Sequence, residues 1–230
     1  MSGVRVRMEK AKVTLDRGGE MSLVYGVPDE FPPGDPTCLV FAHGAGGPMY
    51  SPFLTYFHTE LAKHGFLTVK FNFPYMEARK KTPDKKDVLE AAYRKIVEEV
   101  RSSQYKPDRI FIGGKSMGGR IASQVVAGGV EVNGLFFLGY PLHPPGRLDR
   151  LRDEHLYKIT RPMLFVSGTR DSFGTRELLE KVLSRLGSKA SVHWVEEGDH
   201  SFNTPEGKSA VPRTYETVVR VLVDWAQTSA

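Results

Sequence analysis

The stretch that most constrains the fold spans residues 109–122 and reads RIFIGGKSMGGRIA. Its apolar first half is typical of a strand buried on both faces, and apolar residues at helical spacing follow it. Between them, residues 114–118 match the pattern Gly-x-Ser-x-Gly. A sharp strand-to-helix turn strains the serine backbone and leaves no room for side chains two residues away, which suits Gly114 and Gly118. The segment therefore predicts a strand, a tight turn that presents Ser116, and a helix whose positive end faces that serine.

Residues 114–116 also allow a second interpretation, because they read Gly-Lys-Ser, as in a phosphate-binding loop. That motif needs a glycine five residues before its Gly-Lys pair, and this chain has Arg109 there. We therefore set the phosphate-binding loop aside. The sequence favours Ser116 as a catalytic nucleophile.

Strand patterns alternate with helix patterns along most of the chain. This alternation predicts an α/β fold with a mainly parallel central sheet and helices on both faces. A length of 230 residues, with 40% hydrophobic and 26% charged residues, fits one domain spanning 1–230. Residues 1–27 alternate apolar with charged side chains around Gly18 and Gly19, which predicts an N-terminal hairpin at a sheet edge. The irregular segment 140–161 is too short to form a large cap domain.

Composition narrows the classes of function. The net charge of +5 is a mild excess, so we expect no nucleic-acid partner. No apolar run has membrane-spanning length and the first residues lack a signal-peptide core, so we expect a cytoplasmic protein that does not associate with membranes. The single cysteine, Cys38, lies in an apolar run and is predicted to be a buried, inert thiol.

A serine nucleophile needs a base to take its proton and a third group to orient that base. In parallel α/β sheets such groups lie in the loops that follow strand C-terminal ends. Asp171 and His200 both follow predicted strands, so we assign His200 as the general base and Asp171 as the acid. Asp199 would have difficulty turning back onto the neighbouring ring. The acids weighed against Asp171 are Glu196, Glu197 and Asp199.

The oxyanion that forms during acyl transfer needs preset hydrogen-bond donors. The N–H of Met117 follows the nucleophile directly, and Ala45, with Gly46 as the alternative, is predicted to supply the second donor. His43 is expected to support that loop by hydrogen bonding. For Arg120 we expect a structural salt bridge rather than contact with an anionic substrate, and the same holds for Arg170. The side chains predicted to line the substrate pocket are Tyr75, Tyr140, His143 and Phe173.

Four segments together resemble the α/β-hydrolase superfamily, in particular its small dienelactone-hydrolase-like members and the testis-expressed, KANSL-type group. The resemblance implies a Ser116–His200–Asp171 triad, small ester or related acyl substrates, no cofactor and no metal. Dienelactone hydrolases carry cysteine at the position of Ser116, which argues against dienelactone itself as the substrate. The segments are residues 43–47, 114–120, 167–171 and 198–202.

Three functions stay open at this point. The first is a serine hydrolase, and the second is an acyltransferase that uses the same triad with an acceptor other than water. The third is an interaction module without turnover, because some members of the KANSL-type group act mainly as assembly partners. The sequence leaves open the acyl group, the leaving group (ester, thioester or amide) and the oligomeric state.

Overall fold

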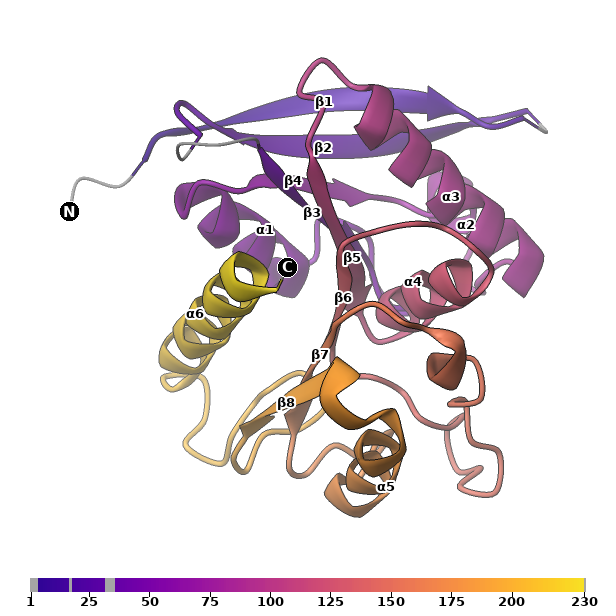
Figure 1. Ribbon diagram of the computed structural model, residues 1–230, viewed down its shortest axis with the longest axis vertical. Coiled ribbons are helices and arrows are strands. Elements are labelled where there is room, and N and C mark those ends of the chain that lie inside the picture. Colours follow the sequence, from indigo (N-terminus) through magenta and orange to yellow (C-terminus); the bar gives the residue numbers. More distant parts are fainter. Residues whose placement is uncertain (1–3, 17, 32–35, 230) are drawn as a thin grey trace.

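A computed structural model describes residues 4–16, 18–31 and 36–229, and its centre is one eight-stranded sheet with helices on both sides (Figure 1). The spatial order of the strands is β1-β2-β4-β3-β5-β6-β7-β8. The strands are β1 (Val6–Thr14), β2 (Glu20–Pro28), β3 (Thr37–Ala42), β4 (Leu67–Phe71), β5 (Arg109–Lys115), β6 (Gly134–Leu138), β7 (Met163–Gly168) and β8 (Ala190–Val195). The helices are α1 (Pro52–Lys63), α2 (Pro74–Glu77), α3 (Lys86–Ser102), α4 (Met117–Ala127), α5 (Arg176–Leu186) and α6 (Val211–Thr228), with short 3₁₀ turns η1 (Leu156–Lys158) and η2 (Gly187–Lys189).

The sheet is parallel from β4 to β8, and only β1 and β2 run against it. The two antiparallel strands form a hairpin at the sheet edge, with Val6 opposite Pro28 and Thr14 opposite Glu20. Residues 1–3 and 17 of the predicted hairpin segment lie outside the described residues. The predicted class, an α/β fold with a mainly parallel sheet, is confirmed.

Each central strand sends alternate side chains to opposite faces of the sheet, as the period of two requires. Ile110 and Ile112 pack toward α3, α4 and α5, whereas Phe111 packs toward α1 and α6. Figure 1 shows these two groups of helices on opposite sides of the strands. Cys38 is fully buried in the first of these cores, and burial raises the pKa of its thiol, as expected for an inert cysteine.

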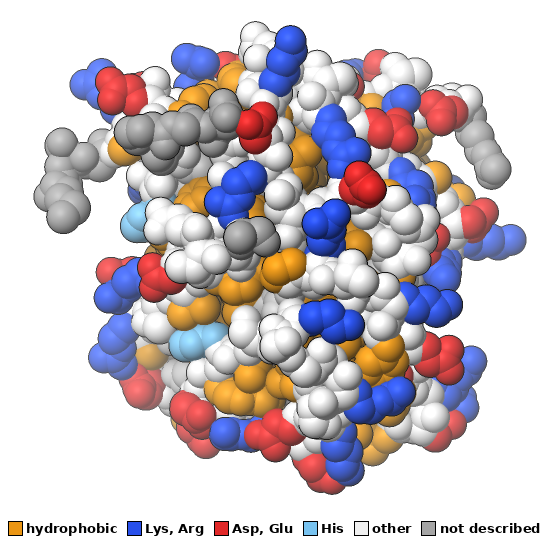
Figure 2. Space-filling model, viewed as in Figure 1, with side chains coloured by type: hydrophobic (Ala, Val, Ile, Leu, Met, Phe, Trp, Pro, Cys, Tyr) orange, Lys and Arg blue, Asp and Glu red, His pale blue; other side chains and the backbone are white. Residues whose placement is uncertain are grey.

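Because β3, β5, β6, β7 and β8 are parallel, the loops after their C-terminal ends meet at one edge of the sheet. The chain from 139 to 162 at this edge has a single 3₁₀ turn, η1, as its regular structure, and no large cap domain is present in the described ranges. None of the helices in those ranges is long and apolar enough to cross a bilayer. On the face in Figure 2, acidic and basic side chains are interspersed.

Candidate active site

Ser116 occupies the turn between β5 and α4, and its backbone is strained. Its φ of 52° and ψ of −115° are rare for a residue with a side chain. The Ser116 N–H donates to the carbonyl of Leu138 on the neighbouring strand, at 3.2 Å, which fixes the turn to the sheet. The predicted strand, turn and helix are therefore all present, with Ser116 at the start of the helix.

The two glycines around Ser116 are required by the closeness of β3. A Cβ on Gly114 would lie 2.1 Å from the carbonyl oxygen of Ala42, and one on Gly118 would lie 2.2 Å from the same oxygen. Real Cβ atoms essentially never come that close to backbone. The strand and helix that flank the serine thus pack against β3 at a distance that only glycine allows.

His200 and Asp171 lie side by side, although 29 positions separate them in the sequence. His200 Nδ1 is 2.7 Å from Asp171 Oδ2, and the other carboxylate oxygen accepts the N–H of Phe173 at 2.8 Å. The Asp171 side chain is fully buried, whereas 20% of the His200 side chain is exposed. An Nδ1–H that donates to the carboxylate leaves Nε2 as the free acceptor, which is the tautomer that a general base needs.

The loops that carry the acid and the base are hydrogen-bonded to each other. Arg170 N–H donates to the carbonyl of Gly198 at 2.9 Å, so the segment after β7 is fixed to the segment after β8. Asp199 was the main alternative to Asp171, but its carboxylate accepts the backbone N–H groups of Ser201 and Asn203 at 2.7 and 2.9 Å. Asp199 therefore shapes the loop that presents the histidine.

The loop after β3 lies against the serine turn. A Cβ on Gly44 would be 3.6 Å from Ser116 Cβ. His43 holds this loop as expected, because its Nδ1 donates to the Gly44 carbonyl at 2.8 Å and its Nε2 accepts the Phe73 N–H at 3.0 Å. Ala45, the predicted oxyanion donor, is exposed in the same loop, and Met117 begins α4, where helix N–H groups lack intrahelical acceptors.

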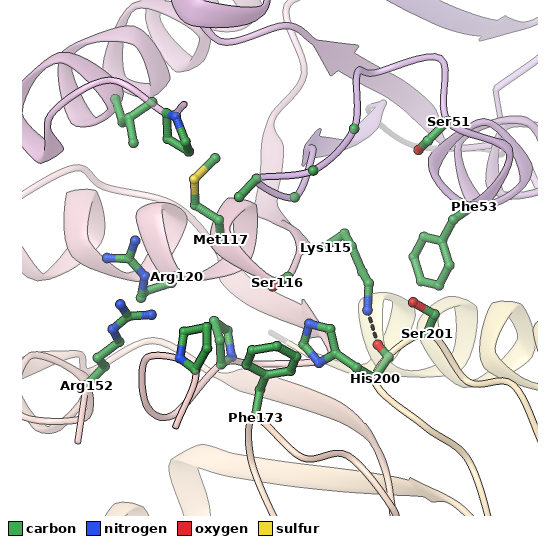
Figure 3. A pocket seen from close by; sticks show the side chains of 18 of the residues that line it. Ser51, Phe53, Lys115, Ser116, Met117, Arg120, Arg152, Phe173, His200 and Ser201 are labelled. Carbon is green, nitrogen blue, oxygen red and sulfur yellow. Dashed lines mark hydrogen bonds between the residues drawn. The ribbon is translucent and has the colours of Figure 1, made fainter. Parts of the chain in front are cut away.

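Ser116, His200 and the loop after β3 line one cavity of about 700 Å³ (Figure 3). Figure 3 shows Ser116 and His200 facing the same space, without a direct hydrogen bond between them; such bonds are often loose before substrate binds. The wall includes loop residues 44–47, Phe53, Met117 and Phe173. The described ranges contain no group of three or more His, Cys, Asp or Glu side chains suited to a metal ion.

Of the four side chains predicted to line the pocket, Phe173 lies in its wall and three do not. Tyr75 is buried behind the loop after β3 and donates to the Ala45 carbonyl at 3.1 Å. Tyr140 is buried with its hydroxyl donating to the Arg152 carbonyl at 3.1 Å, and the buried His143 contacts the Pro144 carbonyl at 2.8 Å. The prediction was wrong for these three because their polar atoms serve the backbone of the surrounding loops.

Lys115, directly before the serine, is a site residue that the sequence analysis missed. Its Nζ donates to the backbone carbonyl of His200 and lies 5.0 and 5.5 Å from the ring centroids of Phe53 and Phe202. Burial lowers the pKa of Lys115 to about 8. The residue thus links the serine turn to the histidine loop. Lys115 occupies a position of the Gly-x-Ser-x-Gly pattern that any residue can fill, so the pattern gave no reason to single it out.

A second serine–histidine contact, between Ser123 Oγ and His155 Nε2 at 2.8 Å, lies outside the cavity. Ser123 is fully buried and its hydroxyl donates to the Arg120 carbonyl at 2.7 Å. With that proton already used, His155 Nε2 must carry its own proton and donate, so it cannot act as a base toward Ser123. Burial also lowers the pKa of His155 to about 4. The hydrogen bond between Ser123 and His155 therefore has a structural role.

Comparison with known proteins agrees with this geometry. The family model described as "Alpha/beta hydrolase domain" matches residues 35–227, which is most of the chain. The chain belongs to the alpha/beta hydrolase family. The predicted resemblance to this superfamily is therefore confirmed.

Solved structures show the same fold over nearly the whole chain. An alpha-beta serine hydrolase homologue from Coxiella burnetii is 18% identical, with a TM-score of 0.72 over 94% of this chain and 96% of that one. A dienelactone hydrolase from Anabaena variabilis is 16% identical, with a TM-score of 0.75 over 97% and 98%. A serine hydrolase described as lacking a lid, from Xanthomonas campestris, is 18% identical, with a TM-score of 0.68 over 97% and 93%. The alpha/beta hydrolase fold therefore extends beyond the residues that the family model matches, and the family itself supports a hydrolase.

Proposed function

We propose that this alpha/beta hydrolase is a serine hydrolase that cleaves small esters or related acyl compounds. The observation that carries the proposal is the 2.7 Å contact between His200 Nδ1 and the buried Asp171 carboxylate, since His200 lines the same cavity as the strained Ser116. A neutral imidazole oriented by a buried carboxylate, beside a serine on a sharp turn, is the arrangement that acyl transfer requires.

In the first half of the reaction, Ser116 Oγ attacks the carbonyl carbon of the substrate while His200 Nε2 takes the hydroxyl proton. Asp171 accepts the Nδ1–H and stabilises the resulting imidazolium. The N–H groups of Met117 and Ala45 donate to the oxyanion, with Gly46 as the alternative to Ala45. The tetrahedral intermediate collapses when the bond to the leaving alcohol breaks and His200 returns the proton to that oxygen. The product of this half is an acyl ester of Ser116.

In the second half, His200 takes a proton from water, and the hydroxide oxygen attacks the acyl carbon. The bond to Ser116 Oγ breaks, the proton returns to the serine, and the acid leaves. Apart from the substrate and water, every reacting group in both steps belongs to the chain, so the proposed reaction needs no cofactor. A small-molecule acyl compound is the proposed partner, and the serine in place of cysteine makes dienelactone a poor candidate.

The test is a panel of 4-nitrophenyl and thioester substrates of increasing acyl length. Wild type is expected to hydrolyse at least one of them, and Ser116→Ala and His200→Ala to lose more than about 1000-fold in kcat. Ser123→Ala is the matched control and is expected to keep its activity within about tenfold. Equal loss in Ser116→Ala and Ser123→Ala, or undiminished turnover by Ser116→Ala, would overturn the assignment.

The two alternatives from the sequence give different outcomes in the same panel. An acyltransferase forms the acyl-enzyme and releases the 4-nitrophenol, but turns over faster when an alcohol or amine acceptor is added. An interaction module leaves every substrate intact although the protein is folded. Product analysis by mass spectrometry distinguishes hydrolysis from transfer.

A further inference from the structure

The two ends of the cavity differ in chemistry. Figure 3 shows Phe53 at one end, Arg120 and Arg152 at the other, and Ser116 and His200 between them. Arg120 comes from α4, one turn after the serine, and Arg152 comes from the irregular chain between β6 and β7. A substrate held at Ser116 would therefore have one part near these guanidinium groups.

Neither of the two arginines makes an ion pair among the described residues, although both line the cavity. Arg170 lies 3.8 Å from Glu197, whereas neither Arg120 nor Arg152 has a carboxylate at ion-pair distance within the described part of the chain. The salt bridge predicted for Arg120 is therefore wrong. Its Nη1 donates to the neutral Gln124 Oε1 at 3.3 Å, and its buried Nε has no partner among the described residues.

The positive charges at this end repel each other. Burial lowers the pKa of Arg120, and burial together with the charge of Arg120 lowers the pKa of Arg152. Four cationic side chains and one acidic side chain line the cavity, a net of +3 with the histidine neutral: Lys86, Lys115, Arg120 and Arg152 against Asp84. An oxyanion between the two guanidinium groups would offset their repulsion and pair with their planar donor groups.

A buried polar cluster behind the cavity holds both arginines in place. The Ser123 hydroxyl donates to the Arg120 carbonyl at 2.7 Å, and the Tyr140 hydroxyl donates to the Arg152 carbonyl at 3.1 Å. His155 Nε2 lies 2.8 Å from the first hydroxyl and 3.1 Å from the second. The backbones of the two arginines are thus fixed relative to each other before any ligand arrives, as a preorganised binding site requires.

We propose that Arg120 and Arg152 form a subsite for an oxyanion group, a carboxylate or a phosphate, carried by the acyl substrate. The subsite rests on the proposed serine hydrolase function and narrows its substrates to anionic esters. Lys86 does not complete it, because its Nζ lies 3.5 Å from Glu90.

The first experiment compares matched anionic and neutral esters. One pair carries the charge in the acyl part (mono-4-nitrophenyl glutarate against 4-nitrophenyl pentanoate), and the other carries it in the alcohol part (4-acetoxybenzoate against its methyl ester). Wild type is expected to prefer the anionic member of at least one pair in kcat/KM. The anionic-to-neutral ratio is expected to fall about 10- to 100-fold in Arg120→Met and in Arg152→Met. This ratio is independent of how much of each variant is folded.

Arg170→Met is the matched control, because Arg170 is exposed, paired with Glu197 and outside the cavity wall. It is expected to keep the wild-type ratio. If wild type prefers the neutral ester of both pairs, or if all three variants have the wild-type ratio, the subsite is overturned while the hydrolase function stands. If no ester is cleaved by folded wild type, the proposed function fails instead.

A binding measurement tests the oxyanion subsite separately from the hydrolase function and shows which oxyanion group binds. The melting temperature of wild type is expected to rise with glutarate or with inorganic phosphate at constant ionic strength, and the larger rise shows which group the subsite prefers. The Arg120→Met/Arg152→Met double variant is expected to lose that rise. Equal rises in wild type and the double variant, or none in wild type, would contradict the subsite even if esterase activity is found.

Discussion

Replacing Gly118 by alanine tests the tight packing on which the serine turn depends. The added Cβ would lie 2.2, 2.6 and 2.9 Å from the O, C and Cβ atoms of Ala42. Ordinary contact for such atoms begins near 3.4 Å, so the start of α4 must move away from β3 by about 1 Å. The displaced segment includes Ser116 and Met117, which are the proposed nucleophile and oxyanion donor.

Both stability and activity are expected to fall. Overpacking a buried site costs about 1–3 kcal/mol, and we expect the upper end here because two of the three contacts are with backbone atoms, which cannot change rotamer. A displacement of about 1 Å in the reacting groups costs about 100-fold in rate. We therefore predict a loss of about 3 kcal/mol in the free energy of unfolding and about 100-fold in kcat.

Two further alanine variants separate the clash from backbone strain. Gly114 has a φ of +144° and a Cβ clash at 2.1 Å, so it carries both costs. Gly129 has a φ of +99° and no atom within 4 Å of the added Cβ, so only the strain of about 1–2 kcal/mol applies. Urea denaturation and ester hydrolysis measure all three. If the free energy of unfolding of Gly118→Ala is within about 1 kcal/mol of the wild-type value and its activity is unchanged, α4 does not pack as closely against β3 as described.

Three shorter predictions concern ionisable side chains. Asp171→Asn is expected to lower kcat about 10⁴-fold, because the carboxylate beside His200 Nδ1 is lost. The control variant Asp199→Asn is expected to lower kcat less than about tenfold. A similar loss of kcat in both variants would mean that the substitutions disturb the loops, and would contradict a specific role for Asp171. Lys115→Met is expected to lower kcat about tenfold through the lost bond to the His200 carbonyl. The pKa of Lys115 is about 8 in the folded protein and 10.5 in the unfolded chain, so between these pH values the unfolded chain binds more protons. The free energy of unfolding of wild type is therefore expected to rise by up to about 3 kcal/mol as pH increases through this range. Urea titrations of Lys115→Met should lack this rise. Burial and the charge of Lys70 lower the pKa of His58 from 6.5 in the unfolded chain to about 3 in the folded protein. The free energy of unfolding is therefore expected to fall by about 1.4 kcal/mol per pH unit as pH drops from 6.5 toward 3. A free energy of unfolding that does not change with pH in this range would contradict the prediction.

The fold and the serine turn could be predicted because their signals are local. A short apolar run, two glycines around Ser116 and helical spacing after it are enough to specify strand, turn and helix. The meeting of Asp171 and His200 is a consequence of topology, since loops after parallel strands share one edge of the sheet. Residues far apart in sequence could therefore be placed together without any knowledge of their contacts.

The lining of the cavity could not be predicted in the same way. Whether Tyr140 faces a cavity or donates to a loop carbonyl depends on rotamers and on packing between distant segments. That Arg120 has no carboxylate at ion-pair distance among the described residues is also a long-range property, because any of the acidic residues could have folded next to it. Lys115 gave no signal, since its contact with the His200 loop exists only after β5 and the loop after β8 come together.

The measurement that tests the proposed function most directly is the identity of the residue that forms a covalent adduct, a phosphonyl ester with a fluorophosphonate or an acyl ester with a slow substrate. Folded wild type is treated with a fluorophosphonate or a slow ester, and the adduct is located by peptide mass spectrometry. We predict one adduct on the peptide that contains Ser116, none in Ser116→Ala, and an adduct at the same position in Ser123→Ala. An adduct on another serine, or no adduct on folded wild type, would contradict the central claim.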